Sequence, residues 1–360
     1  MFYANTCKET VVSLRILILL PLLYFLFFFC NKPAPVVPEA TSDWPVSTLG
    51  AEGIDSVRFA PTLRYVEDTV QDIYSMVIIR NGRIVLEKYY HIINIDTTYL
   101  IRSTTKSIVG ALIGIAIRDG LIKDGLNAKI LDYFPDKQFE NCTGGKQNMT
   151  IKDVLTMRTG LEWDDDKDDF FNVPDPVKYI LDKPMDTVPG VKWNYNSGAS
   201  HLLSAILTRE SGMSLSDYAY QKLFHPLGIE VYDWQMDCTG LFFGGYGLFL
   251  KPKDIAKIGL LYMNQGQWNG TEIVPQEWIA ASTDSISSTY WPECGSYGYH
   301  WWVQHHNGYK GYGTVGLYGQ NMYVIPEKNL IIVFLSQLGS SSAVPTLNRV
   351  VDEYILPSVD

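Results

Sequence analysis

The sequence predicts an α/β (α+β) fold, in which helices flank one antiparallel sheet and a helical domain is inserted into the chain. Two β-forming runs at 76–90 are joined by Asn81-Gly82, a pair typical of a tight hairpin turn. Strand-like runs return only near the C-terminus, and residues 121–285 carry mostly helical patterns. We therefore expect the early hairpin and the late strands to pair in one antiparallel sheet.

The composition is that of a globular protein with a substantial core. The chain has 360 residues, of which 46% are hydrophobic and 19% are charged, enough for one large or two medium domains. Its net charge of -10 and the lack of a Lys/Arg cluster argue against nucleic acid as a partner. Acidic polymers are unlikely partners for the same reason.

The first thirty residues differ from the rest. An apolar run at 16–30 follows Lys8 and Arg15, which predicts a signal or lipoprotein-type anchor at 1–30. The run is shorter than the roughly 20 residues that a membrane span needs, so a cleaved or lipid-attached export signal is favoured. Cys30 resembles a lipoprotein acceptor, although Phe27–Phe29 replace the expected small residues. We expect a periplasmic or extracellular protein, attached to a membrane through this segment.

The elements follow in order. Residues 31–60, rich in Pro, Ala, Ser and Thr, are typical of a linker. An α/β sheet domain then comprises 61–120 and 286–360. Within it, residues 107–118 are apolar on nearly all sides, which predicts a buried central helix. The late strands are expected at 297–303, 320–325 and 330–336, before a terminal helix near 344–355.

The inserted domain, residues 121–285, is expected to be helical with irregular loops. Its helical patterns lie at 130–134, 151–157, 176–182, 199–211, 215–223, 252–264 and 275–282.

The residues that could bind a metal lack the spacing of a metal site. Cys142, Cys238 and Cys294 have no zinc-type spacing, and one disulfide and three buried free thiols remain alternatives. The acidic run 164–169 lacks the Gly and Glu of a calcium loop, so a solvated or substrate-rim loop is favoured. The pair His305-His306 is interpreted as a surface turn. No metal and no cofactor are expected.

One histidine and two tryptophans are interpreted as packing residues rather than as metal ligands. His201, Trp301 and Trp302 are expected to pack in the core or line a cleft.

Ser103 and Lys106 form the first candidate for chemistry. They lie three residues apart at the start of the predicted central helix. A serine nucleophile needs a base, and a lysine one turn away can serve if its amine is partly unprotonated. The helix N-terminus also offers free N–H groups to an oxyanion. This spacing alone is common, and a solvated helix start is the alternative.

Two later stretches strengthen the candidate. Residues 193–198 start another apolar helix and display Tyr195, which could shuttle protons. Residues 311–320 are glycine-rich and lead into a strand, so a ligand could approach the backbone closely there.

In this order, and separated by a helical insertion, the three stretches resemble the serine β-lactamase and penicillin-binding superfamily, specifically its class C-like branch of esterases and 6-aminohexanoate-dimer hydrolase. The resemblance covers about residues 70–355. It implies an exported serine hydrolase that acts through an acyl-enzyme on a small ester or linear amide. Ser103 would be the nucleophile, Lys106 its helper and Tyr195 the general base and then acid. Supporting stretches lie at 155–161, 252–259, 297–302 and 319–326.

The resemblance also implies a binding site at the strand edge. The N–H groups of Ser103 and Gln320 would form the oxyanion hole, and Ser197, Tyr318 and Gly319 would contact substrate. Whether Lys106 accepts the proton, or stays charged beside a Tyr195 tyrosinate, is left open by the sequence.

Two departures from the family pattern concern the substrate. Ser197 replaces the Asn of the Tyr-x-Asn motif, and Leu317-Tyr318-Gly319 stands where a Lys/His-Thr/Ser-Gly triad is expected. Lys310 and Thr314 lie just upstream, so a shifted register is an alternative. An apolar Leu317 cannot bind a carboxylate electrostatically. Esters and linear amides are therefore favoured. The alternatives are a β-lactamase or D-alanyl-D-alanine carboxypeptidase, and a non-catalytic binding protein on the same fold.

Overall fold

The computed structural model of the chain describes residues 44–91 and 93–360, which belong to one compact unit. The predicted signal or anchor segment, Cys30 included, and the first part of the predicted linker lie outside the described residues. Among the helices within that range, none is long and apolar enough to cross a membrane.

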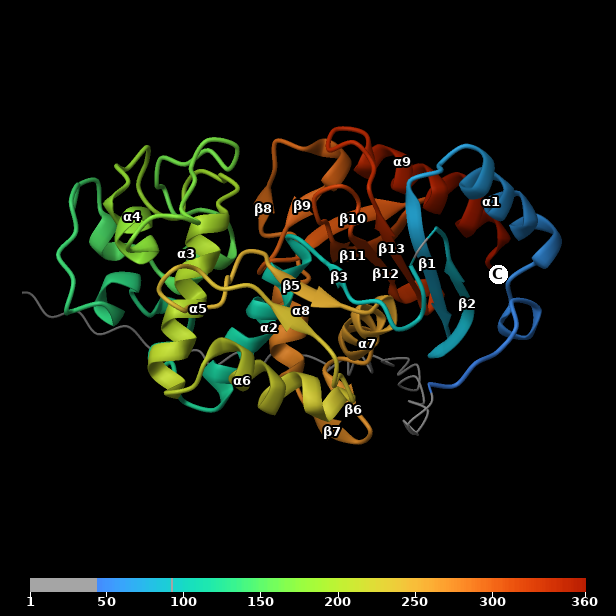
Figure 1. Cartoon of the computed structure of the whole chain (residues 1–360), viewed down its shortest axis with the longest axis horizontal. Coiled ribbons are helices and arrows are strands. Elements are labelled where there is room, and N and C mark those ends of the chain that lie inside the picture. The colour runs from blue at the N-terminus through green and yellow to red at the C-terminus, as the bar shows by residue number, and fades with distance from the viewer. Residues whose placement is uncertain (1–43, 92) are drawn as a thin grey trace, which may run out of the picture. The chain divides into compact units, whose positions relative to one another are not determined.

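An antiparallel sheet of eight strands, in the order β2-β1-β13-β12-β11-β10-β9-β8, forms the centre. Strand β1 (Ile73–Arg80) pairs on one side with β2 (Arg83–Tyr89) and on the other with β13 (Leu330–Ser336). Strands from both ends of the described chain are thus neighbours (Figure 1). The predicted hairpin and its pairing with late strands are confirmed. The other strands are β8 (Ser287–Ser288), β9 (Ser296–Tyr297), β10 (Trp302–His306), β11 (Tyr309–Thr314) and β12 (Asn321–Ile325).

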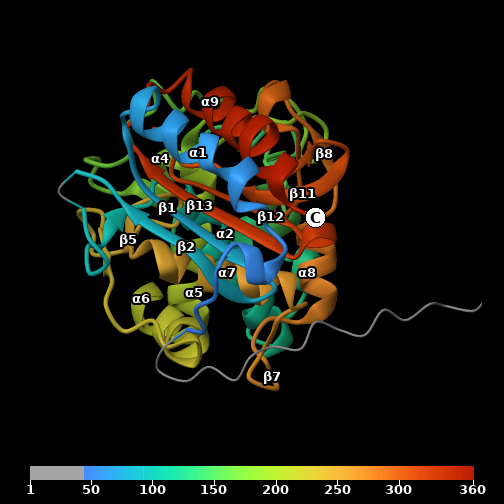
Figure 2. The ribbon, with the colours of Figure 1, turned by 90° about the vertical axis from the view of Figure 1, so that its right-hand side faces the viewer.

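Helices cover both faces of this sheet (Figure 2). On one face lie α1 (Ser56–Asp68), α9 (Ala343–Arg349) and a helical turn at Val350–Ile355. On the other lie α2 (Thr104–Arg118), α7 (Pro252–Met263) and α8 (Gln276–Ser282). Successive residues of a strand point to opposite faces. The central strand β1 is accordingly apolar at successive positions, because Met76 and Ile78 pack on the first group and Val77 and Ile79 on the second.

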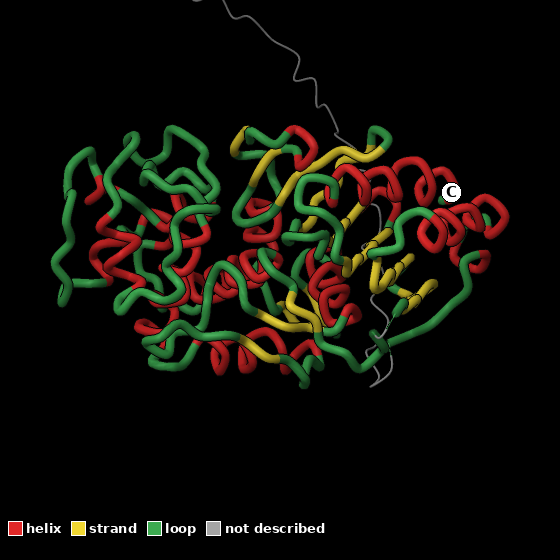
Figure 3. The backbone as a smooth tube through the Cα atoms, turned by 45° about the horizontal axis from the view of Figure 1, so that its top comes forward, coloured by secondary structure: helices red, strands yellow, loops and turns green. Residues whose placement is uncertain are grey.

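Helices α3 (Ile151–Leu155), α4 (Pro176–Asp182) and α5 (Ser197–Ser211) gather beyond one end of the sheet in Figure 1, and α6 (Leu215–Ala219) packs against α5. Much of this helical end consists of loop (Figure 3). Helix α2 is buried from Thr104 to Ala116, as predicted for a central helix. It contacts α5, so one hydrophobic core continues from the sheet into the helices. The division into two domains stays a prediction.

Small strands complete the described part of the chain. Strand β5 (Leu248–Leu250) pairs with β3 (Tyr99–Leu100) and with β4 (Asp233–Trp234), and β6 (Gln267–Trp268) pairs with β7 (Thr271–Glu272). Short helical turns lie at Gly50–Glu52, Gly125–Asn127, Ile130–Tyr133, Lys146–Asn148, Tyr220–Phe224, His225–Leu227, Pro292–Cys294, Pro326–Lys328 and Leu356–Ser358.

The structure corrects three predicted elements. Helix α1 begins at Ser56, inside the predicted linker, and Asp55 caps it by accepting two backbone N–H groups. The predicted strand 297–303 is two strands, β9 and β10, joined by a turn in which His300 has φ 59°. The glycine-rich stretch contains strand β11, where Gly313 lets a neighbouring carbonyl approach closely: an added Cβ would lie 1.9 Å from Met322 O.

Histidine and cysteine predictions are also refined. His305 and His306 lie in β10 rather than in a turn, and buried His306 lies 2.9 Å from Asp352 through Nδ1. Cys142, Cys238 and Cys294 are free thiols, but only Cys294 is buried. His201, Trp301 and Trp302 are buried, as expected for packing groups.

Candidate active site

Ser103 occupies the position just before α2, and its hydroxyl makes no capping hydrogen bond. The preceding residue, Arg102, has φ 53°, a backbone conformation that non-glycine residues rarely adopt and that often marks a functional site. Lys106, one turn into the helix, places Nζ 3.0 Å from Ser103 Oγ. The predicted pair is therefore brought within hydrogen-bonding distance.

Lys106 is almost completely buried, with 1% of its surface exposed. Besides Ser103, its Nζ lies 2.9 Å from Ser197 Oγ and 2.7 Å from the carbonyl oxygen of Gly245. Burial lowers the pKa of Lys106 to about 8, although the negative charge of Asp165 acts in the opposite direction. A usable fraction of the amine is therefore neutral near pH 7.

Tyr195 lies beside this pair, with its ring centroid 4.7 Å from Lys106 Nζ. Burial raises the pKa of Tyr195 well above its usual value, the charge of Asp165 adds to this, and hydrogen bonding with Ser103 acts against it. The phenol is therefore protonated at neutral pH. This favours Lys106 over a tyrosinate as the group that can accept a proton from Ser103.

Ser197 starts α5 and brings a hydroxyl to Lys106. Asn196 caps the helix by accepting a hydrogen bond from the N–H of Ala199, at 2.7 Å. Gly198 allows Trp163 to pack closely, since a Cβ there would lie 2.4 Å from the indole ring. The stretch from Tyr195 to Gly198 thus fixes the start of α5 against the loop that contains Trp163.

Asp165 on that loop was not among the predicted catalytic or binding residues. Its Oδ2 accepts a hydrogen bond from Ser197 Oγ at 2.5 Å, and its Oδ1 accepts from the N–H of Ser197 at 2.8 Å and from Trp163 Nε1 at 2.6 Å. One residue of the acidic run therefore contacts the site. The position of Trp163 directly before the acidic run, with its indole N–H needing an acceptor, is the sequence signal that could have indicated this.

Gly245 was also missed. Glycines are needed at Gly244 and Gly245 because a Cβ would lie 2.4 Å from Ser200 O and 2.6 Å from Ser197 O, respectively. The N–H of Gly244 donates to His201 Nδ1 at 3.2 Å, so His201 carries its hydrogen on Nε2, 3.0 Å from Asp237 Oδ2. This buried pair holds the loop that presents the Gly245 carbonyl to Lys106.

Gln320, which directly precedes β12, has contacts that differ from its predicted role in the oxyanion hole. The N–H of Gln320 donates to Gly316 O at 3.2 Å, and its side-chain amide hydrogen-bonds Ser336. Gln320 is 2% exposed. Its N–H is therefore already paired in this structure, which does not favour the predicted role of Gln320 in an oxyanion hole. Its carbonyl oxygen accepts a hydrogen bond from Thr104 Oγ1.

Gly319 and Tyr318 also have structural contacts in the turn between β11 and β12. Their carbonyl oxygens both accept hydrogen bonds from Ser336 Oγ, and a Cβ on Gly319 would lie 2.2 Å from that oxygen. The Tyr318 ring lies 5.4 Å from the Arg102 guanidinium. A substrate contact is therefore not evident for Gly319.

Strand β11 is the strand whose end meets the start of α2. Thr314, its last residue, lies 3.0 Å from Thr104 through the two hydroxyls, and Gly316 packs so closely that a Cβ would lie 2.7 Å from Ile101 O. The residues beside the nucleophile are thus Thr314-Val315-Gly316. This favours the shifted register of the triad that the sequence left open.

Aromatic side chains form one wall beside Tyr195. Its ring centroid lies 5.3 Å from that of Trp291 and 6.2 Å from that of Trp302, and Trp193 contacts all three rings. Trp291 and Leu317 are 42% and 46% exposed. The rim of the site therefore offers apolar surface to a ligand.

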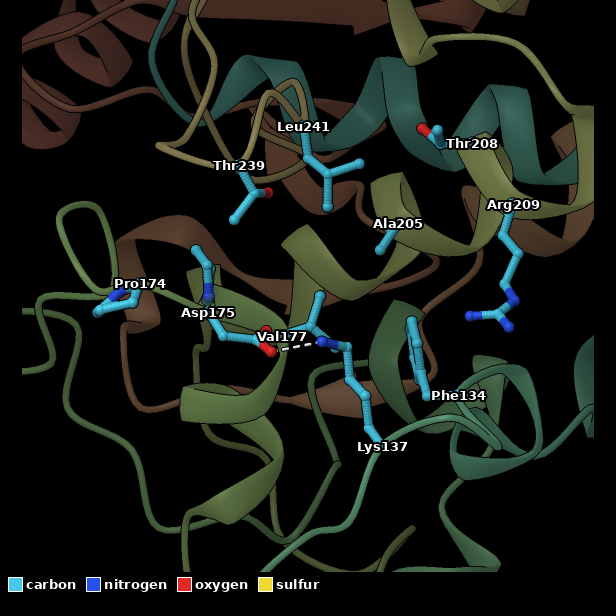
Figure 4. Close-up of a pocket in the computed structure, with 11 residues that line it drawn as sticks. Phe134, Lys137, Pro174, Asp175, Val177, Ala205, Thr208, Arg209, Thr239 and Leu241 are labelled. Atoms are coloured by element: carbon cyan, nitrogen blue, oxygen red, sulfur yellow. Dashed lines mark hydrogen bonds and ion pairs between the residues drawn. The ribbon is translucent and has the colours of Figure 1, made fainter.

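A separate pocket of about 300 Å³ lies between residues 134–137, 174–177, α5 and residues 239–241 (Figure 4). None of Ser103, Lys106 and Tyr195 lines it, and its Lys137 is paired with Asp175. It is not the reaction site. Over the described ranges, no cluster of His, Cys, Asp or Glu could hold a metal ion.

Comparisons with known proteins show the family and the fold of the chain. A family model described as Beta-lactamase matches residues 65–354. The 6-aminohexanoate-dimer hydrolase of Paenarthrobacter ureafaciens is 24% identical over 333 residues, which cover 82% of this chain and 79% of that protein.

Two solved structures share the fold. The octameric penicillin-binding protein homologue from Pyrococcus abyssi superposes with a TM-score of 0.65 at 20% identity, over 84% of this chain and 78% of that one. EstCE1, described as a hydrolase with promiscuous acyltransferase activity, gives 0.68 at 15% identity, over 82% and 98%. Because the family model spans most of the sequence and a hydrolase is among the relatives, the chain belongs to the Beta-lactamase family and is a serine hydrolase.

Proposed function

We propose that this protein hydrolyses a small ester or a linear amide through an acyl-enzyme formed on Ser103. The observation that carries the proposal is the buried Lys106 amine, 3.0 Å from Ser103 Oγ, with its pKa lowered to about 8. A nucleophilic serine needs such a base, and a base works best when its pKa lies near the working pH.

Acylation begins when neutral Lys106 accepts the Ser103 proton as Oγ bonds to the substrate carbonyl carbon. Tyr195, which is protonated and hydrogen-bonded with Ser103, is placed to pass a proton to the leaving group and to regain one through Lys106. Water then enters where the leaving group was, gives up a proton by the same route and releases the acid. Ser103 is regenerated.

The oxyanion formed in each step needs two N–H donors. We assign this role to the backbone N–H groups of Ser103 and Leu317. Neither N–H donates to an acceptor within residues 44–91 and 93–360, whereas the N–H of Gln320 does. Leu317 follows directly after Thr314-Val315-Gly316, which packs against the start of α2.

The substrate class follows from the residues at the end of β11, where Thr314-Val315-Gly316 takes the place of the family's triad. Thr314 at the first triad position has no positive charge to bind the carboxylate of a β-lactam or a D-alanyl-D-alanine end. The exposed Trp291 and Leu317 favour an apolar acyl or leaving group. A relative named 6-aminohexanoate-dimer hydrolase supports a linear amide, and EstCE1 supports hydrolysis or acyl transfer as reaction types.

Purified protein and Ser103→Ala should be compared on nitrophenyl acyl esters, 6-aminohexanoate dimer and nitrocefin. We expect ester or amide turnover by the wild type and a loss on the order of 10⁴ to 10⁶ in Ser103→Ala, with the fold intact. Turnover of nitrocefin alone would favour a β-lactamase. If no substrate is turned over and a fluorophosphonate does not label Ser103, the chain is a binding protein on this fold.

We also propose export and membrane attachment through residues 1–30, on the apolar run and the preceding Lys8 and Arg15. Mass spectrometry of the mature N-terminus tests this. A lipid on Cys30 or cleavage near it is the expected result, and an intact Met1 on a protein recovered from the cytoplasm would contradict it.

A further inference from the structure

Asp165 lies on an exposed loop and is linked to the active-site lysine through Ser197. Its Oδ2 accepts a hydrogen bond from Ser197 Oγ at 2.5 Å, and Ser197 Oγ lies 2.9 Å from Lys106 Nζ. Lys106 Nζ is in turn 3.0 Å from Ser103 Oγ. A hydrogen-bonded chain therefore runs from the carboxylate to the nucleophile.

The number of hydrogens in this chain fixes its direction. A serine hydroxyl has one hydrogen, and an ionised carboxylate only accepts. Ser197 therefore donates to Asp165 and presents only lone pairs to Lys106. The Gly245 carbonyl, 2.7 Å from Nζ, also accepts only. A neutral amine has two hydrogens and one lone pair, so both hydrogens go to Ser197 and Gly245, and the lone pair is left for Ser103.

We propose that Asp165 is a positioning residue for acylation: by holding the Ser197 hydroxyl as its donor, it reserves the lone pair of neutral Lys106 for the proton of Ser103. The proton moves from Ser103 Oγ to Lys106 Nζ while Oγ bonds to the acyl carbon. Without the carboxylate, the Ser197 hydroxyl can donate to Lys106 and occupy that lone pair. The inference rests on the proposed function.

The charge of Asp165 also acts on Lys106. Among the titratable groups facing Lys106, burial lowers the pKa of His300 to about 3 and raises the pKa of Tyr195, so both are uncharged near pH 7. His300 Nδ1 faces the backbone carbonyl of Lys106 at 3.1 Å. Asp165 is thus the charge that opposes burial at Lys106. Its removal should lower the pKa of the amine further.

Asp165 could also act only by anchoring its loop, and that role would depend on the contacts of its other carboxylate oxygen. Asp165 Oδ1 also accepts from the backbone N–H of Ser197 and from Trp163 Nε1, which ties the loop to α5. Ser197→Ala keeps that backbone contact and removes only the hydroxyl. This variant therefore separates positioning from anchoring.

The test measures the pH dependence of Ser103 acylation by a nitrophenyl ester in Asp165→Asn, Ser197→Ala, the double variant and Asp166→Asn. Asp166 is the matched control, because it lies one residue away and is exposed like Asp165, but its carboxylate makes no hydrogen bond within the described residues. Circular dichroism and Tm verify folding.

For Asp165→Asn we expect acylation about 10- to 100-fold slower at its optimum. We also expect its acidic limb to move about 0.5 to 1 pH unit lower. Asp166→Asn should follow the wild type. Ser197→Ala alone should also slow acylation, because the amine then lacks the acceptor that holds one of its two hydrogens. Adding Asp165→Asn to it should change the optimum rate little, because two residues that act through one contact are not additive.

An acidic limb in Asp165→Asn that coincides with that of Asp166→Asn would overturn the inference. So would an equal loss of rate from Asp165→Asn with and without the Ser197 hydroxyl. If Asp165→Asn does not fold, a wild-type rate in Ser197→Ala overturns it instead. Failure of the proposed function is distinguishable, because the wild type would then form no acyl-enzyme on Ser103.

Discussion

Lys106 has three hydrogen-bond partners and almost no exposed surface, so its charge is set mainly by burial. The three partners include two that can only accept, Gly245 and the Asp165-bound Ser197. At this scale the sequence predicted Ser103, Lys106, Tyr195 and Ser197, which the structure brings together. It could not indicate Gly245, because a backbone carbonyl carries no side-chain signal.

The pH dependence of acylation follows from the burial of Lys106. Because the reactive form of the amine is neutral, the rate should be low well below pH 8 and rise as pH increases through about 8. In Lys106→Arg the side chain stays charged throughout this range. We expect a loss of about 10² to 10⁴ and no such rise. Stopped-flow acylation from pH 5 to 10 measures both the loss of rate and the rise with pH. If Lys106→Arg kept the same acidic limb, the pH dependence would belong to a group other than Lys106.

At the scale of elements, the site depends on close backbone approaches. Helix α4 and strand β13 match their predicted bounds, since Asp175-Pro176 is a typical helix start and 330–336 is a continuous apolar run. Helix α1 and strand β11 were missed because Pro61 and the glycines of 311–316 usually interrupt such elements. Tertiary contacts, not local preference, hold both.

The loop before β5 offers a test at this scale. In Gly245→Ala the new Cβ would lie 2.6 Å from Ser197 O, so the backbone must shift and Lys106 loses a well-placed acceptor. We expect about 1–3 kcal/mol of destabilisation and slower acylation. Gly50→Ala, with no atom within 4 Å of its Cβ, is the control. Urea unfolding and acylation rates measure the two effects; wild-type values for both would show that the loop tolerates the shift.

At the scale of the molecule, strands from the beginning and the end of the described chain form adjacent parts of one sheet, and α2 carries the same core into the helices. The antiparallel sheet was predictable from the hairpin and the late apolar runs. The position of the acidic loop was not, because it depends on contacts between α5 and a loop some 30 residues earlier in the chain.

This continuous core predicts cooperative unfolding. Urea denaturation should give one transition, coincident by tryptophan fluorescence and far-UV circular dichroism, because α2 is buried between the sheet and the helices. Ile332→Ala, at a fully buried position in β13, should lower the free energy of unfolding by about 2–5 kcal/mol, the usual cost of such a cavity. Two separate transitions would instead support the predicted division into a sheet domain and an inserted helical domain.

Intact-mass and peptide mass spectrometry after a brief reaction with a slowly hydrolysed nitrophenyl ester tests the central claim most directly. The wild type should carry one acyl group on the peptide that contains Ser103, formed faster at pH 9 than at pH 6 and absent in Ser103→Ala. Turnover of the ester by a wild-type protein that never carries an acyl group on Ser103, or equal turnover by Ser103→Ala, would contradict it.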